Sequence, residues 1–103
     1  MASRLQLQTD LEALNIGRPY FQPPSSVRLT YPCILYDGAR SEVTYASDRA
    51  YTITKQYTLI YITRDPDEAQ ASIETIVRAF PMCSHDRSYV ADNLHHEVFS
   101  LFY

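Results

Sequence analysis

The sequence predicts an α+β fold, a two-layer sandwich in which two α-helices pack on a mainly antiparallel β-sheet of about four strands. Apolar residues recur with helical spacing near the start of the chain and again past its middle. The segments between and after these helices alternate as strands do, and turn residues separate them. The resulting order of helix, two long strands, helix and two more strands is typical of a sheet covered by helices on one face.

The first helix is expected over about residues 4 to 15. Leu7, Leu11 and Leu14 follow the i, i+4, i+7 spacing of one helical face, and Gly17 stands where a helix commonly stops. The ten residues from Gly17 to Ser26 contain three prolines, each of which lacks the amide donor that a regular element needs. They predict an irregular connector.

Two strands and a hairpin arm are expected next. Val27–Tyr36 reads as a strand with Pro32 at an edge or a bulge. The fourteen residues from Asp37 to Ala50 contain Gly38 and several turn-forming residues, which indicate a long β-hairpin arm. Tyr51–Thr63 gives the clearest strand pattern of the chain, because its aromatic and aliphatic residues alternate with a threonine-rich face.

The second helix is expected over about residues 66 to 80. Asp65 is the predicted N-cap, Pro66 the first helical residue, and Glu68 the third helical residue, which completes a capping box. Its apolar stripe consists of Ala69, Ile73, Ile76, Val77 and Phe80. A short strand over Ser84–Tyr89, a turn at Ala91-Asp92-Asn93 and a closing strand over Leu94–Tyr103 complete the predicted order.

Length and composition limit the classes of protein. A chain of 103 residues forms one domain, spanning residues 1–103, with one modest core. The net charge of −3 argues against a dedicated nucleic-acid binder, which usually has a basic face. No apolar run approaches the ~20 residues that span a membrane, and the start of the chain lacks a signal-peptide pattern. We therefore expect a soluble protein made in a cytoplasm, where Cys33 and Cys83 remain free thiols.

Two groupings of polar residues are candidates for chemistry. Cys83, His85 and Asp86 form the pattern of a small hydrolase, in which a base holds a cysteine as thiolate. A packed strand cysteine explains Cys83 better, since no glycine-rich nucleophile elbow accompanies it. A metal site would need His85, Asp86 and Asp92 together with His95 or His96, and neighbouring residues of a strand point to opposite faces.

Other sites of chemistry are not expected. The acidic group Asp65, Asp67 and Glu68 is explained by helix capping, and two glycines are too few for a phosphate loop. The sequence thus predicts no catalytic residue, no metal and no cofactor, and a protein that is not an enzyme.

Arginine and tyrosine are over-represented in the chain, and both are enriched at protein contact surfaces. There are nine tyrosines and eight arginines, against a single lysine and two glycines. The best interface candidates lie in the connector and in the arm, where irregular backbone carries them beside aromatic residues. They are Arg18, Tyr20, Phe21, Arg40, Tyr45 and Arg49.

Four segments carry a resemblance to a known family. They are Tyr20-Phe21-Gln22-Pro23-Pro24, Tyr31-Pro32-Cys33-Ile34-Leu35-Tyr36, Tyr57 to Ile62 with Arg64-Asp65-Pro66-Asp67, and Asp86-Arg87-Ser88-Tyr89-Val90-Ala91-Asp92-Asn93-Leu94. With the aromatic final strand, they resemble the small tail-completion proteins of long-tailed bacteriophages, also described as tail terminator, head-tail joining or minor capsid proteins. The resemblance covers about residues 11 to 103, and its motifs are composite rather than catalytic.

The resemblance implies a structural virion protein. Such proteins form a ring, commonly a hexamer, at the head-proximal end of the tail tube, where the ring ends tube polymerisation and joins tail to head. The implied partners are further copies of the chain, the tail tube protein and the head-tail connector or neck proteins. DNA is implied to pass through the lumen without specific binding. The implied location is the tail or neck of the virion, after synthesis in the cytoplasm of a bacterial host.

Three alternatives remain open at this point. The family description covers terminator and neck roles, so a head-tail connector of the same assembly is one alternative. A non-viral protein-interaction module is a second. A small hydrolase built on Cys83 and His85 is the third.

Overall fold

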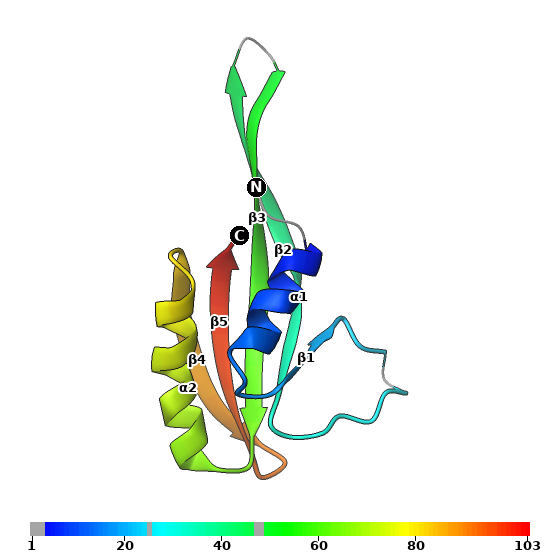
Figure 1. The fold of residues 1–103 in the computed structure, drawn as a ribbon, viewed down its shortest axis with the longest axis vertical. Coiled ribbons are helices and arrows are strands. Elements are labelled where there is room, and N and C mark those ends of the chain that lie inside the picture. The colour runs from blue at the N-terminus through cyan, green and yellow to red at the C-terminus, as the bar shows by residue number, and fades with distance from the viewer. Residues whose placement is uncertain (1–3, 25, 47–48) are drawn as a thin grey trace.

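The structure, a computed structural model, describes residues 4–24, 26–46 and 49–103, with the backbone alone described for 39–46 and 49–54. These residues form α1 (Arg4–Ala13), β1 (Arg18–Phe21), β2 (Cys33–Ala46), β3 (Arg49–Thr63), α2 (Pro66–Ala79), β4 (Cys83–Ala91) and β5 (Leu94–Phe102). The strands make one sheet in the order β1-β2-β3-β5-β4 (Figure 1). Only the β1–β2 pair is parallel. The predicted α+β class is confirmed, with one strand more than expected.

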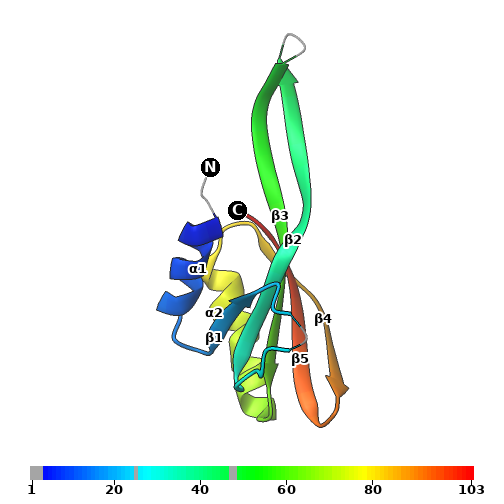
Figure 2. The same ribbon diagram turned by 90° about the vertical axis from the view of Figure 1, so that its right-hand side faces the viewer.

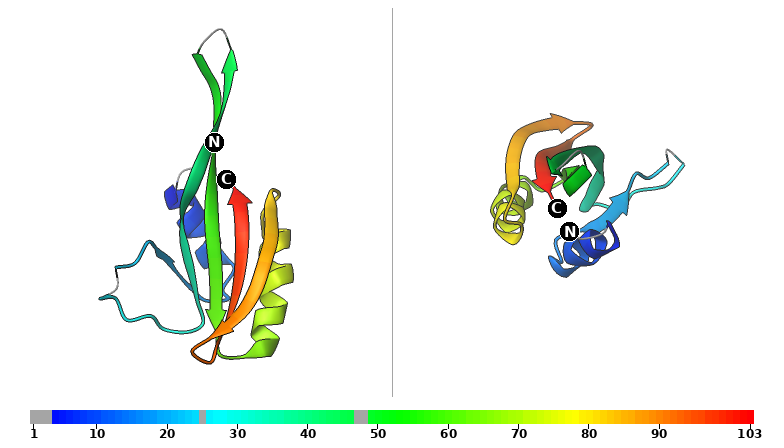
Figure 3. Two further views of the ribbon diagram at one scale, coloured as in Figure 1. Left: turned by 180° about the vertical axis from the view of Figure 1, so that it is seen from behind. Right: turned by 90° about the horizontal axis from the view of Figure 1, so that it is seen from above.

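Both helices lie on one face of the sheet, and no described helix covers the other face (Figures 2 and 3). The core between the layers takes Leu7 and Leu11 from α1 and Ile76 from α2, all fully buried. The sheet contributes Ile34, Tyr36, Tyr57, Leu59, Tyr61, Phe99 and Leu101. Every second residue of the central strands therefore points at the helices, as the alternating pattern of Tyr51–Thr63 predicts.

The end of β5 ties the two helices together. The Tyr103 ring contacts Phe80 edge-on, with centroids 5.9 Å apart. Its hydroxyl donates to the Asp10 carboxylate of α1. Burial and this hydrogen bond raise the pKa of Tyr103 to about 12, so the phenol stays protonated at neutral pH.

The hairpin of β2 and β3 extends well beyond the rest of the sheet (Figure 1). Its register runs from Cys33↔Ile62 to Ala46↔Arg49. However, β5 pairs with β3 only as far as Gln56↔Phe102, and β1 pairs with β2 only as far as Phe21↔Tyr36. The molecule is accordingly elongated, 51 × 30 × 24 Å, with a radius of gyration of 14.7 Å against about 13 Å for a compact chain of this length. The predicted arm is confirmed.

The connector predicted over Gly17–Ser26 contains a short strand, β1, which the sequence did not indicate. Pro19 has no amide to give, but parallel pairing with β2 uses the amides on either side of it. The Gln22 amide continues the ladder by donating to the Tyr36 carbonyl at 3.0 Å. An edge strand tolerates a proline in this way, so the reading of three prolines as an irregular segment was wrong for Arg18–Phe21.

The strand predicted over Val27–Tyr36 begins only at Cys33. Pro32 therefore precedes the strand instead of lying at an edge or bulge within it, and the Tyr31–Pro32 peptide bond is cis. The physical reason is that β3 ends at Thr63 and β1 begins opposite Cys33, so the residues before Cys33 have no strand beside which to pair.

Helix α1 ends at Ala13, two residues earlier than predicted, and Gly17 does not end it. The chain leaves the helix at Asn15, whose φ of 55° is left-handed. Gly17 serves a different purpose. A Cβ at Gly17 would lie 3.1 Å from the backbone of Pro32 and Cys33, so glycine allows the two chain segments to meet.

The start of α2 confirms the N-cap and Pro66 but not the capping box. Asp65 accepts a 2.9 Å hydrogen bond from the Asp67 amide. Glu68 does not reach back to the Asp65 amide, which donates to the Thr63 hydroxyl instead. The Glu68 carboxylate accepts from the hydroxyls of Tyr61 and Thr63, both at 3.4 Å. The buried phenol of Tyr61 thus competes successfully for the glutamate.

The closing hairpin agrees with the sequence and is slightly longer than predicted. Asp92 and Asn93 have φ values of 53° and 62°, the left-handed pair of a two-residue type I′ turn. Strand β4 carries a bulge between His85 and Arg87.

The two glycines provide a matched test of the packing at Gly17. Gly17→Ala should lower the free energy of unfolding by about 1–3 kcal/mol, because the added methyl meets rigid backbone. Gly38→Ala adds the same methyl where nothing lies within 4 Å, and it should be neutral or slightly stabilising. Urea denaturation of both variants measures the difference. Equal effects would show that the close approach at Gly17 does not matter.

Candidate assembly interface

The hairpin arm is the first candidate surface. From Glu42↔Thr54 to Ala46↔Arg49 it is a ribbon of two strands, and among the described residues no third strand pairs with either side. The last bond on the β5 side runs from the Tyr103 amide to the Lys55 carbonyl, at 3.0 Å. A two-stranded ribbon is only marginally stable in water, because it has no layer to pack against. The backbones of Arg40, Tyr45 and Arg49 lie in the arm, and their side chains lie outside the described part of the structure.

Strand β1 is the second candidate surface. Arg18 is exposed and lies over the ring of Tyr20, 5.5 Å from its centroid. Phe21 points away from them and into the structure, with its ring 5.1 Å from that of Tyr36. Arg4 covers Phe21 at 4.7 Å. Arg18 and Tyr20 are thus available to a partner, whereas Phe21 also serves the fold.

A groove of about 850 Å³ runs between α1 and the segment that contains β1. Arg4 and Arg18 both line it, and among the described residues neither forms an ion pair. Tyr20 and Tyr31 add aromatic surface to the same groove. Arg4 donates a 3.5 Å hydrogen bond to the Tyr36 hydroxyl, and Glu12 also lines the groove. Two guanidinium groups beside aromatic rings suit the carboxylates of a protein partner.

The structure does not bring the two sets of predicted interface residues into one patch. Phe21 lies beside Tyr36 in the register of the sheet, and Tyr45 lies nine residues further along β2. At about 3.3 Å per residue, this separation is about 30 Å. The connector and the arm are therefore separate surfaces of the subunit.

Strand β4 is a third surface, which the sequence reading did not single out. It is an edge strand whose residues from Asp86 to Ala91 are all exposed. Tyr89 stacks on His96, with centroids 4.5 Å apart and an angle of 9° between the rings. Arg87 lies 5.3 Å from the Tyr89 centroid. The spacing of two between arginine and tyrosine, which puts both on one face of a strand, also occurs at Arg18 and Tyr20 and was visible in the sequence.

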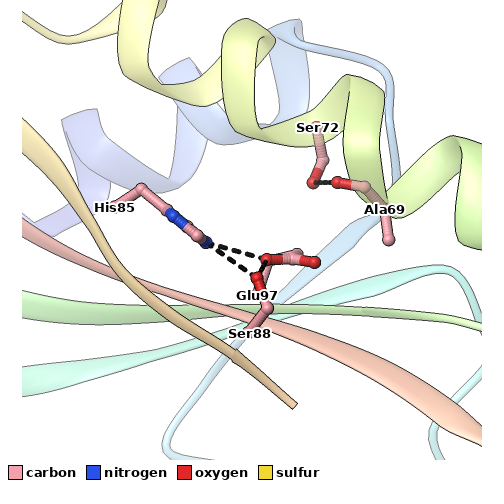
Figure 4. Close-up of polar contacts among 5 residues, drawn as sticks. All are labelled: Ala69, Ser72, His85, Ser88 and Glu97. Atoms are coloured by element: carbon pink, nitrogen blue, oxygen red, sulfur yellow. Dashed lines mark hydrogen bonds and ion pairs between the residues drawn. The ribbon is translucent and has the colours of Figure 1, made fainter. Parts of the chain in front are cut away.

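A polar cluster lies between β4, β5 and the overlying α2 (Figure 4). The His85 Nε2 is 2.8 Å from the carboxylate of Glu97, which is 5% exposed. The Ser88 hydroxyl donates to the same carboxylate oxygen and lies 3.3 Å from the same histidine nitrogen. In a hydrolytic triad the serine and the acid engage opposite nitrogens of the histidine. Here Ser88 and Glu97 both contact Nε2 of His85, so the three side chains hold β4 and β5 together and do not form a triad.

Neither cysteine has the properties of a nucleophile. Burial raises the pKa of Cys33 to about 11, and burial together with Asp86 raises the pKa of Cys83 to the same value. Asp86 itself accepts hydrogen bonds from Ser84 and Ser100. The thiol of Cys83 packs against the apolar core and stays protonated at neutral pH.

The residues considered for a metal are used in other ways. His96 stacks on Tyr89, and its Nδ1 is 3.0 Å from the Leu94 carbonyl. Within the described ranges, no three His, Cys, Asp or Glu side chains gather as metal ligands would. The same residues contain no helix long and apolar enough to cross a membrane.

Comparisons with protein-family models, with curated proteins and with solved structures find no match to this chain.

The reactivity of the thiols tests the hydrolase alternative. At pH 7.5 the folded protein should react with iodoacetamide about 100-fold more slowly than the urea-unfolded chain, because a pKa two units higher leaves about one hundredth of the thiolate. Mass spectrometry of alkylated peptides follows Cys33 and Cys83 separately. Rapid alkylation of Cys83 alone would return it to consideration as a nucleophile.

Proposed function

We propose that this chain is a structural virion protein that forms a ring at the head-proximal end of a phage tail tube, ends tube polymerisation and joins the tail to the head. One observation carries the proposal. The β2–β3 arm extends beyond the sheet as a ribbon, and no third strand among the described residues of its own subunit pairs with it. Such a ribbon is stabilised when a neighbouring subunit supplies that contact.

The form of the subunit also supports a ring. A ring needs a heterologous interface, in which one surface of a subunit meets a different surface of the next. The arm is at one end of the molecule, and β4 and β1 lie on its body (Figure 3). The β4 edge is exposed, and the groove beside β1 is lined by Arg4 and Arg18. The subunit therefore offers separate donor and acceptor surfaces.

The sequence segments that resemble tail-completion proteins supply the phage assignment. They fall on β1, on the start of β2, on the β3–α2 junction and on the β4–β5 hairpin. These are the elements that build the sheet and its edges. The resemblance therefore concerns the scaffold and its surfaces, as expected for a protein that acts through contacts.

DNA passing through such a ring would meet a subunit of mildly acidic charge. With a net charge of −3 per subunit, a lumen lined by acidic residues repels phosphates and limits sticking. In this proposal DNA passes through the ring without specific binding, and the binding partners are proteins.

The second candidate is a head-tail connector of the same assembly. The same arm and edges suit it, because connectors also form rings through heterologous contacts. Electron microscopy of tails lacking the protein distinguishes the roles. Loss of a terminator gives tails of uncontrolled length, whereas loss of a connector leaves tails of normal length detached from heads.

Shortening the arm tests the proposal directly. Replacing residues 43–53 by Asn-Gly joins the register partners Glu42 and Thr54 through a two-residue turn, and their pair is the hydrogen-bonded one because the Lys55 carbonyl points to Tyr103 instead. We expect the free energy of unfolding to change by less than about 1 kcal/mol, because the pairs removed lie outside the core. Native mass measurement should then find a monomer where the full chain gives a ring.

Charge reversal in the arm supplies a milder variant and a control. Arg40→Glu combined with Arg49→Glu should also abolish assembly while the monomer stays folded. Arg78→Glu, at a helix position whose side chain is 77% exposed, should leave assembly unchanged. A full chain that is monomeric at all concentrations, or an arm-shortened chain that still forms rings, would contradict the proposal.

A further inference from the structure

The two edges of the sheet differ in their ability to take another strand. At the β1 edge, Pro19 has no amide to offer, and its carbonyl accepts a 3.4 Å hydrogen bond from Gln8 of α1. Pro19 is also buried. Since β1 has only four residues, these features close most of that edge to pairing.

The β4 edge is open. The type I′ turn at Asp92-Asn93 makes Ala91 and Leu94 a hydrogen-bonded pair, and the alternation of the strand then directs the amide of Tyr89 to β5. The amides of Ser88 and Val90 consequently point away from the sheet. Val90 is 62% exposed, and no described element covers it.

The arm has a free edge of matching length. On β2, the seven residues from Arg40 to Ala46 lie past the end of β1 and follow the bulge at Ala39. They extend about 24 Å at about 3.4 Å per residue. On β4, the five residues from Arg87 to Ala91 lie past the bulge and extend about 17 Å. The register with β3 shifts again between Thr44 and Tyr45, so the regular part of this edge is the five residues from Arg40 to Thr44, about 17 Å. That length equals the open part of β4.

We propose that Arg87–Ala91 of each subunit accepts the β2 edge of the neighbouring subunit's arm by backbone pairing. This inference rests on the proposed ring. In this pairing the β2 edge of the arm bonds to a third strand, and the exposed amides of β4 donate to carbonyls of the arm. Because the donor and the acceptor are different strands, each subunit gives one arm and receives one. The contact is heterologous and propagates until the ring closes.

A single exposed amide allows the test. Val90→Pro removes an outward N–H, and an edge strand tolerates proline at such a position. It should leave the monomer folded and raise the concentration needed for assembly at least about tenfold, since a hydrogen bond is lost and the approach of the arm is blocked. Val90→Ala, which shortens the side chain and keeps the amide, is the matched control and should assemble within about threefold of the wild type.

Mixing two variants tests the direction of the contact. The arm-shortened chain is an acceptor without a donor, and Val90→Pro is a donor without an acceptor. Together they should form a one-to-one dimer by native mass spectrometry and assemble no further. If the arm-shortened chain alone dimerises through β4, the occupant is a second β4 strand and the inference is wrong.

Hydrogen exchange of the wild-type chain decides the question without a substitution. The amides of Ser88 and Val90 should exchange at least about tenfold more slowly in the ring than in the dilute monomer. The amide of Tyr89, which is bonded to β5, should be protected in both. A ring in which Ser88 and Val90 exchange freely would overturn the β4 pairing and leave the ring itself intact. A chain that never assembles would overturn the proposed function instead.

Discussion

The pairing of β2 with β3 is the constraint on which the rest of the structure depends. Its inner half, from Cys33↔Ile62 to Gly38↔Tyr57, supplies the central strands of the sheet and places Ile34, Tyr36, Leu59 and Tyr61 on the face that the helices cover. Strand β1 adds to one side of this half and β5 to the other. The outer half receives no such support. One continuous hairpin therefore contains both the central strands of the subunit and, in the proposed ring, the part that meets a neighbour.

The two edges of the sheet differ in how far they are protected against pairing with another strand. An unpaired edge invites association with any other strand, and proteins limit this with prolines, bulges or a covering element. The β1 edge is protected by Pro19 and by Gln8. The β4 edge has its bulge between His85 and Arg87, and beyond it the strand is regular and exposed as far as Ala91. Protecting one edge while leaving the other open favours directional assembly over unlimited sheet growth.

The sequence was sufficient for the elements whose signals are local, and it failed where two distant segments compete. The N-cap of α2, its apolar stripe, the turn before β5 and the hairpin arm were all predicted from neighbouring residues. Strand β1 was missed because its pairing depends on Cys33–Tyr36, and the capping box was wrong because the buried Tyr61 takes the Glu68 carboxylate. The exposed edge position of β4 likewise could not be predicted from the sequence, because the order of strands in the sheet depends on the whole chain.

No third strand among the described residues pairs with the arm, and in the proposed ring this links the conformation of the arm to assembly. Ordering the backbone of each residue costs about 1–2 kcal/mol, and a two-stranded ribbon recovers only part of this through its own hydrogen bonds. If the neighbour's β4 supplies the remaining bonds, each arm gains stability only when a contact forms, and a closed ring gives every arm that contact at once. An open oligomer then has one unpaired arm at one end and one unoccupied β4 edge at the other, and the closing step pairs the two. The same property that makes the arm a weak part of the monomer would make the complete ring the preferred state.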